Sequence, residues 1–182
     1  MRNILGPLDR PMCPEIEAIL QNYPQQDGYL LTLFRTFANS KRFLQKAVPN
    51  LLDKESPLSL RQREIVILRT TANRNCEYEW GVHVAIFAKA AGFSEAQIAA
   101  TRYPEANSEL WDADEHLLIR CIDQLCDQGI VEDADLHHFQ QCWSLEQQLE
   151  IMALCGTYHT VSFVANTARL AGEEFGARFP AA

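Results

Sequence analysis

Residues 73–83, NRNCEYEWGVH, place a thiol, two carboxylates and an imidazole within about three helical turns. On a helix that begins near Asn75, the side chains of Cys76, Glu79 and His83 stand at positions i, i+3 and i+7 and share one face. A carboxylate beside an imidazole orients its tautomer and raises its basicity, so that an adjacent thiol or carbon acid can be deprotonated. The spacing therefore predicts a proton relay on this face.

The protonation of Cys76 stays open at this point. Unpaired N–H groups and the positive dipole end in the first helical turn favour a thiolate. The carboxylates of Glu77 and Glu79 oppose it by like-charge repulsion, unless His83 is protonated or Glu79 is neutral. The alternative interpretation is a buried, inert cysteine beside a solvated acidic face, with Glu77 in solvent.

Glu64 is a fourth candidate, from the preceding helix. Its neighbours Ile65, Leu68 and Ala72 form an apolar stripe that must pack inward. The short turn NRN folds this helix back against the next one, so we expect Glu64 to approach His83.

Apolar residues recur at helical spacing along most of the chain, and alternation of period two is hard to find. Ser59, Ser94 and Ser144 each begin an S-x-x-Q capping box, and Asp112 begins a looser acidic version. We therefore predict one all-α domain over residues 1–182, without a linker. The expected helices cover residues 14–23, 29–47, 60–72, 76–91, a short stretch after Ser94, 114–128, 133–143 and 145–170, with a loop over 102–110.

Composition excludes several classes of protein. The 182-residue chain is 47% hydrophobic and 22% charged, as in soluble globular proteins, and its net charge of −8 argues against nucleic acid. The most apolar run, IMALCGTYHTVSFVA, is short for a membrane span. Six cysteines without a C-x-x-C pair, and no secretory signal at the start, indicate the cytoplasm. We expect no membrane partner, no bound cofactor and no metal.

Two acidic and histidine-rich segments invite a metal interpretation, and helix capping explains both better. Asp112, Asp114, Glu115 and His116 fall in a first helical turn, where carboxylates are favoured. Residues 132–138, EDADLHH, are also a helix start, and adjacent histidines point about 100° apart on a helix. We further expect four cysteines to be inert core residues: Cys121, Cys126, Cys142 and Cys155.

The last apolar helix carries polar side chains that need partners. Tyr158 with Ser162, or His159 with Asn166, could line a pocket or an interface, and ordinary buried polar groups explain them equally well. We assign Tyr158, together with Tyr78 and Trp80, to the walls of a substrate pocket.

Residues 58–101 resemble the carboxymuconolactone decarboxylase family, which includes the alkyl hydroperoxidase D (AhpD)-like proteins. The matching motifs are L-x-x-R-x-R-E ending at Glu64, then I-L-R, then C-E-Y-E-W-x-x-H from Cys76 to His83, then A-x-x-A-G-F-S. The resemblance implies an all-helical AhpD-like fold and a homo-oligomer, as a dimer, trimer or hexamer. In the family's peroxidase branch, a C-x-x-C pair, a histidine and a glutamate act together. Those positions are Cys76, Glu79, His83 and Glu64, so Glu79 stands where that branch has a second cysteine.

This departure excludes an internal disulfide cycle at Cys76 and leaves three hypotheses. The first is single-cysteine reduction of a hydroperoxide, in which an external thiol reduces the sulfenic acid and Glu64, Glu79 and His83 carry protons. The second is a lyase or isomerase for a small carboxylated lactone, with His83 or Glu79 as acid and Arg69 or Arg74 meeting carboxylates. The third is a non-enzymatic helical oligomer that binds a ligand or a partner.

Overall fold

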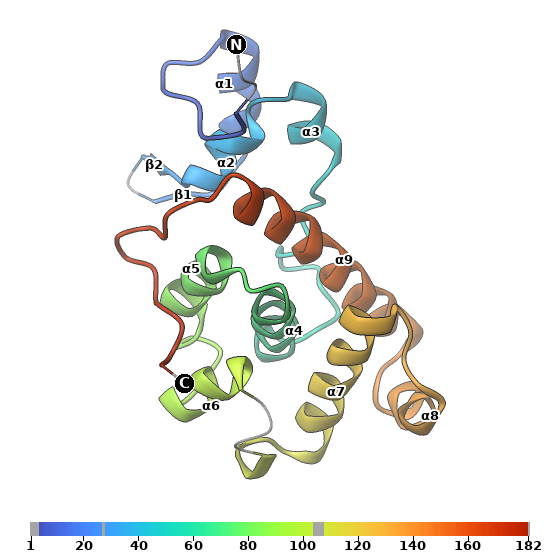
Figure 1. Ribbon diagram of the computed structural model, residues 1–182. Helices are drawn as coiled ribbons and strands as arrows, with labels where there is room; N and C mark the ends of the chain where they lie inside the picture. The colour runs from blue at the N-terminus through green and yellow to red at the C-terminus, as the bar shows by residue number, and fades with distance from the viewer. Residues whose placement is uncertain (1–3, 27, 104–107, 182) are drawn as a thin grey trace.

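The computed structural model describes residues 4–26, 28–103 and 108–181, and this part of the chain is almost entirely helical (Figure 1). One short antiparallel pair, β1 (Gln25–Gln26) and β2 (Tyr29–Leu30), was not expected. A 3-10 turn covers Ser108–Leu110. The helices are α1 (Pro14–Leu20), α2 (Thr32–Phe37), α3 (Lys41–Lys46), α4 (Leu60–Asn73), α5 (Glu77–Phe87), α6 (Glu95–Arg102), α7 (Ala113–Gln128), α8 (Asp133–Cys142) and α9 (Leu145–Thr167).

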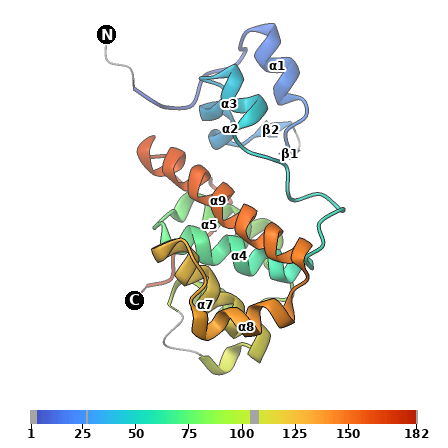
Figure 2. The ribbon, with the colours of Figure 1, turned by 90° about the vertical axis from the view of Figure 1, so that its right-hand side faces the viewer.

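Helix α4 lies at the centre of the fold, with α5, α6, α7 and α9 packed around it (Figure 1). All nine residues from Glu64 to Ala72 are consequently buried, polar ones included. The N-terminal elements α1, α2 and α3 stack on the side of α9 away from α4 (Figure 2). A helix enclosed on all sides can hold polar groups only where they are paired, which makes α4 a natural carrier of a buried site.

The helix starts predicted from capping boxes are confirmed. Ser59, Ser94 and Ser144 each accept a hydrogen bond from the backbone N–H three residues on, and the glutamine at that position reaches back to the cap. Asp112 forms the same box with Glu115. Within the described residues, no helix combines the length and the apolar character needed to cross a membrane.

The single helix predicted over residues 29–47 is wrong. Tyr29 and Leu30 form β2, and two short helices follow, separated at Asn39 and Ser40. Ser40 is extended (φ −142°) and its hydroxyl accepts from the Phe43 N–H at 3.1 Å, while the Asn39 amide donates to the Thr36 carbonyl at 2.8 Å. Short polar side chains that bond locally to the backbone compete with continuation of a helix, and here they interrupt it.

Three other helices end earlier than predicted. Helix α1 stops at Leu20, α5 at Phe87 and α9 at Thr167. Gly92 does adopt the left-handed conformation (φ +74°) expected of it, beyond a short turn after α5. Residues 104–107 of the predicted loop lie outside the described residues.

Residues 171–181, here called the C-terminal strap, run back from α9 along α5 (Figure 1). The Ala177 N–H donates to the Gly81 carbonyl at 3.0 Å, and the Phe179 ring lies 5.1 Å from the ring of Trp80. The Phe179 N–H donates to Glu77, whose carboxylate is therefore engaged rather than directed to solvent as expected. The strap closes the outer side of α5.

Gly81 is required by this close approach. A Cβ at position 81 would lie 2.1 Å from the Ala177 carbonyl oxygen, so Gly81→Ala must displace the strap. We expect a loss of about 1–3 kcal/mol in the free energy of unfolding, measured by urea denaturation. Gly156→Ala is the control, because a Cβ there meets nothing and alanine favours a helix. Equal stability of Gly81→Ala and the native protein would contradict the packing of the strap.

Candidate functional site

Three helices bring three buried polar side chains together around a fourth, His83. From α4, Glu64 places Oε2 2.9 Å from His83 Nδ1. From α9, the Tyr158 hydroxyl lies 2.9 Å from Nε2, and Glu79 Oε1, on α5 itself, lies 3.5 Å from the same nitrogen. The structure thus places Glu64 against His83, as the short turn between their helices led us to expect. Every one of these residues is at most 6% exposed.

Cys76 stands at the N-cap of α5 rather than inside its first turn, and it is completely buried. Its N–H donates to the Thr71 carbonyl at 2.9 Å, which ties it to the end of α4. Asn75, in the left-handed region at φ +51°, reverses the chain between the two helices. The thiol is therefore held by the backbone at the α4–α5 junction.

Cys76 and His83 lie beside different turns of α9. Tyr158 contacts His83, and Asn166, two turns later on α9, donates to the Arg74 carbonyl at 2.8 Å, so Ser162 between them lies at the level of Cys76. Tyr158 and Ser162 are four residues apart on one face of α9, and Cys76 precedes His83, so the two helices run antiparallel here. Glu79 falls between the two levels, close to both the thiol and the imidazole.

The charge of His83 follows from its two carboxylate neighbours. Burial lowers its pKa, but Glu64 and Glu79 outweigh burial and raise the pKa from 6.5 to about 10. As an imidazolium, His83 donates from Nδ1 to Glu64 and from Nε2 to the Tyr158 oxygen. The pKa of Tyr158 is raised well above its usual value by burial and by the same carboxylates, so it keeps its proton and can donate it elsewhere.

The Cys76 thiol is protonated at neutral pH in the resting protein. Burial raises its pKa to about 11, and the Glu79 carboxylate adds to the effect. The Glu79 backbone N–H and the Ser162 hydroxyl act in the opposite direction, because both favour the thiolate. Within the described residues, Glu79 Oε2 and Ser162 Oγ are buried without a hydrogen-bond partner. Glu79 Oε2 is therefore free to receive the thiol proton.

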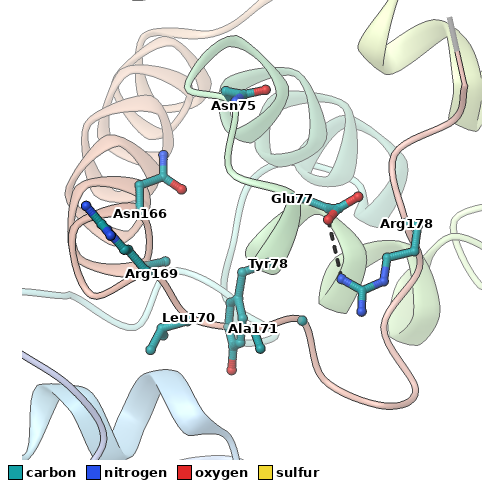
Figure 3. A pocket seen from close by; sticks show the side chains of 10 residues that line it. Asn75, Glu77, Tyr78, Asn166, Arg169, Leu170, Ala171 and Arg178 are labelled. Carbon is teal, nitrogen blue, oxygen red and sulfur yellow. Dashed lines mark hydrogen bonds and ion pairs between the residues drawn. The ribbon is translucent and has the colours of Figure 1, made fainter.

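An open cavity of about 510 Å³ lies at the N-terminal end of α5 (Figure 3). Asn75 and Glu77, which line it, flank Cys76 in the chain, and Asn166 lies one turn beyond Ser162. Arg178 of the strap forms an ion pair with Glu77 at its edge. The cavity is therefore lined by chain neighbours of Cys76, while Cys76 and Ser162 themselves do not line it.

The aromatic residues predicted as pocket walls lie in different places. Tyr158 belongs to the polar cluster, and Tyr78 lines the cavity while donating its hydroxyl to Glu173 of the strap. Trp80 does not line this cavity and instead packs against Leu68 and Ala72 of α4 and Phe179 of the strap. The role of Glu173 was missed, because no spacing in the sequence relates it to residues nearly 100 positions earlier.

The segments that invited a metal interpretation have other roles. Asp112 caps α7, and Asp135 accepts from Arg120 at 2.6 Å. Over the described ranges, no group of three histidine, cysteine or acidic side chains is placed to hold a metal ion. Of the four cysteines predicted in the core, Cys121 and Cys155 are buried and Cys126 is partly buried. Cys142 is exposed, because it ends α8 on the surface.

Comparison with known proteins agrees with the fold and with the motif. Residues 41–119 match the carboxymuconolactone decarboxylase family, which confirms the resemblance. Two solved structures of the debrominase Bmp8 share the fold. A Cys→Ala variant in complex with 2,3,4-tribromopyrrole gives a TM-score of 0.71 at 13% identity, over 96% of this chain and 94% of that one. The apo form gives a TM-score of 0.65 at 16% identity, over 96% of this chain and 95% of that one. No curated protein matches the sequence.

The charge of His83 makes stability depend on pH. Because its pKa is raised from 6.5 in the unfolded chain to about 10, its contribution is complete below pH 6.5 and is lost as the pH rises towards 10. We expect the difference in unfolding free energy between the native protein and His83→Gln to shrink between about pH 6.5 and pH 9. Urea denaturation across this range measures it. Parallel profiles for the two proteins would show that His83 is neutral in the fold.

Proposed function

We propose that this chain, whose residues 41–119 match the carboxymuconolactone decarboxylase family, reduces small hydroperoxides through Cys76. The observation that carries the proposal is the contact of one buried thiol with a relay of Glu79, His83 and Glu64. Thiol peroxidases need a base to form the thiolate and an acid to protonate the leaving oxygen. The cluster contains both.

The first step is activation of the thiol. The proton of Cys76 passes to the unpartnered Oε2 of Glu79, beside the positive imidazolium of His83. Because the pKa of Cys76 is about 11, the thiolate is a minor species at neutral pH, and the thiol has to lose its proton in the course of the reaction. A thiolate of high pKa is also the more nucleophilic one, which favours attack once it forms.

The second step transfers oxygen. The Cys76 sulfur attacks the distal oxygen of the hydroperoxide, the S–O bond forms and the O–O bond breaks. Sulfur is oxidised to a sulfenic acid, and the peroxide is reduced to an alkoxide. The alkoxide takes the proton held by Glu79, or that of Tyr158 with resupply through His83, and leaves as an alcohol. Overall, thiol and hydroperoxide give sulfenic acid and alcohol.

Regeneration requires an external thiol, because Glu79 stands at the position of the second cysteine. The first thiol forms a mixed disulfide with Cys76 and releases water, and a second thiol releases Cys76 and leaves as a disulfide. The free cysteines of the described chain suit a reducing cytoplasm, which supplies such thiols. This cycle uses no bound cofactor.

A lyase acting on a small carboxylated lactone is the second candidate. It is favoured by one observation: His83 with a pKa of about 10 is a charged acid, and Cys76 is a neutral thiol. Arg69, once a candidate for the substrate carboxylate, is engaged by Asp123 at 2.5 Å and by the Thr101 carbonyl. Arginines at the cavity, Arg169 and Arg178, would have to take that role.

Two variants separate these candidates. For peroxide reduction, Cys76→Ser should abolish turnover and His83→Gln should reduce it by about 10²-fold or more, the usual range for a lost acid or base. For the lyase, Cys76→Ser should retain turnover. Three activities would be measured: hydroperoxide consumption in the presence of a dithiol reductant, decarboxylation of a lactone, and debromination of a bromopyrrole. Oxidation of Cys76 would be detected by mass spectrometry. Oxidation no faster than that of a free model thiol would contradict the peroxidase.

We also propose that the protein forms a homo-oligomer through the outer face of α9. Leu145, Leu149, Met152 and Phe163 repeat at helical spacing there, and Leu149 and Phe163 are 68% and 58% exposed. The exposed positions between Leu149 and Phe163 carry no charged side chain, which is unusual for a solvated helix face.

The oligomer is tested by light scattering after gel filtration. Leu149→Lys should lower the molar mass towards that of one chain, because a charge would be buried in the interface. Ile130→Lys, equally exposed but beyond the end of α7, should leave the molar mass unchanged. A native protein that already has the mass of a single chain would refute this proposal.

A further inference from the structure

We propose that Ser162 is a positioning residue for the reaction at Cys76: its hydroxyl, unpartnered in the resting protein, donates to the sulfur once the thiolate forms, and its oxygen accepts the O–H of the bound hydroperoxide. The inference rests on the proposed peroxidase function. It identifies the group that aligns the O–O bond with the thiolate, and it assigns a role to a buried hydroxyl that the relay itself does not use.

The position of Ser162 is fixed by helix register. Ser162 lies one turn after Tyr158 on the inner face of α9, so the contact of Tyr158 with His83 determines which level of α5 Ser162 meets. That level is the N-cap, where Cys76 lies. Both Ser162 and Cys76 are 0% exposed, so neither group exchanges its partner for bulk water.

The hydrogen bonds of Ser162 are incomplete, which points to a ligand. A serine hydroxyl has one donor and two acceptor sites. In the described structure Ser162 Oγ is buried without a hydrogen-bond partner, so its donor site and both of its acceptor sites are unused. Many inward-facing serines on helices bond back to a carbonyl of the preceding turn. Ser162 does not, and a buried hydroxyl left in this way calls for a functional explanation.

A hydroperoxide completes these bonds. Its terminal O–H donates to the Ser162 oxygen, which places the distal oxygen beside the sulfur to which Ser162 also donates. The proximal oxygen then points towards Glu79 and Tyr158, which hold the protons for the leaving group. One hydroxyl therefore stabilises the thiolate and orients the bond to be broken. Such alignment of reacting atoms is a large part of catalysis.

The test compares two variants of almost identical shape, Ser162→Thr and Ser162→Val, which differ in the hydroxyl. We expect Ser162→Val to slow oxidation of Cys76 by hydrogen peroxide at pH 7 by roughly tenfold relative to Ser162→Thr, as loss of one hydrogen bond to a charged group implies. The pH profile of the oxidation rate should also move upward for the valine variant. Thr160→Ala, on the outer side of α9, is the control and should behave as the native protein.

A second measurement applies if neither Ser162→Thr nor Ser162→Val folds. In Ser162→Ala, the ultraviolet absorbance of the Cys76 thiolate, corrected with Cys76→Ser, should develop at higher pH than in the native protein. Unchanged titration together with rapid oxidation would overturn the role of Ser162 and leave the peroxidase standing. Slow oxidation of Cys76 in the native protein would instead remove the peroxidase, whatever the titration shows.

Discussion

The pairing of His83 with Glu64 across the α4–α5 interface is the interaction on which the site depends. An imidazolium enclosed between helices is tolerated only because carboxylates compensate the cost of removing it from water, and removal of either partner would leave a buried charge uncompensated. The bond at 2.9 Å also fixes the ring, so that Nε2 points at Tyr158 and Glu79. Helix α4 can carry Glu64 inward because α5, α6, α7 and α9 surround it.

The same helix α5 is held from outside by the C-terminal strap. Gly81 permits the contact with Ala177, Trp80 and Phe179 pack together, and Glu173 collects hydrogen bonds from Tyr29, Tyr78 and the Thr32 backbone. Through Glu173, the C-terminal strap is thus joined to β2 and to the first residue of α2. They keep water from the outer side of α5 and form one wall of the cavity beside Cys76. Enclosure of this kind strengthens every charge interaction inside the site.

Burial gives Cys76 a chemistry that differs from that of an exposed reactive cysteine. A low-pKa thiolate reacts with whatever oxidant or electrophile reaches it. Cys76 is instead kept neutral, with its pKa near 11, and its proton has one free acceptor in Glu79 Oε2. In the proposed reaction, reactivity depends on a ligand that completes the hydrogen bonds of Glu79 and Ser162. Selectivity for the ligand would then follow from the arrangement of Glu79 and Ser162 around Cys76 and not from the thiol alone.

The amino-acid sequence by itself determined the helices and the polar face of α5. Capping boxes and apolar spacing are local signals, so Ser59, Ser94, Asp112 and Ser144 marked their helix starts correctly. Glu79 and His83 share one side of α5, with Cys76 at its N-cap. The sequence erred where local signals compete, as at Asn39 and Ser40, where side-chain bonds to the backbone broke a helix that the apolar pattern favoured. Only the tertiary structure decided the direction of the Cys76 pKa, the level at which Ser162 meets the sulfur and the place of Glu173. Each of these depends on burial and on contacts between distant segments, and spacing along the chain carries neither.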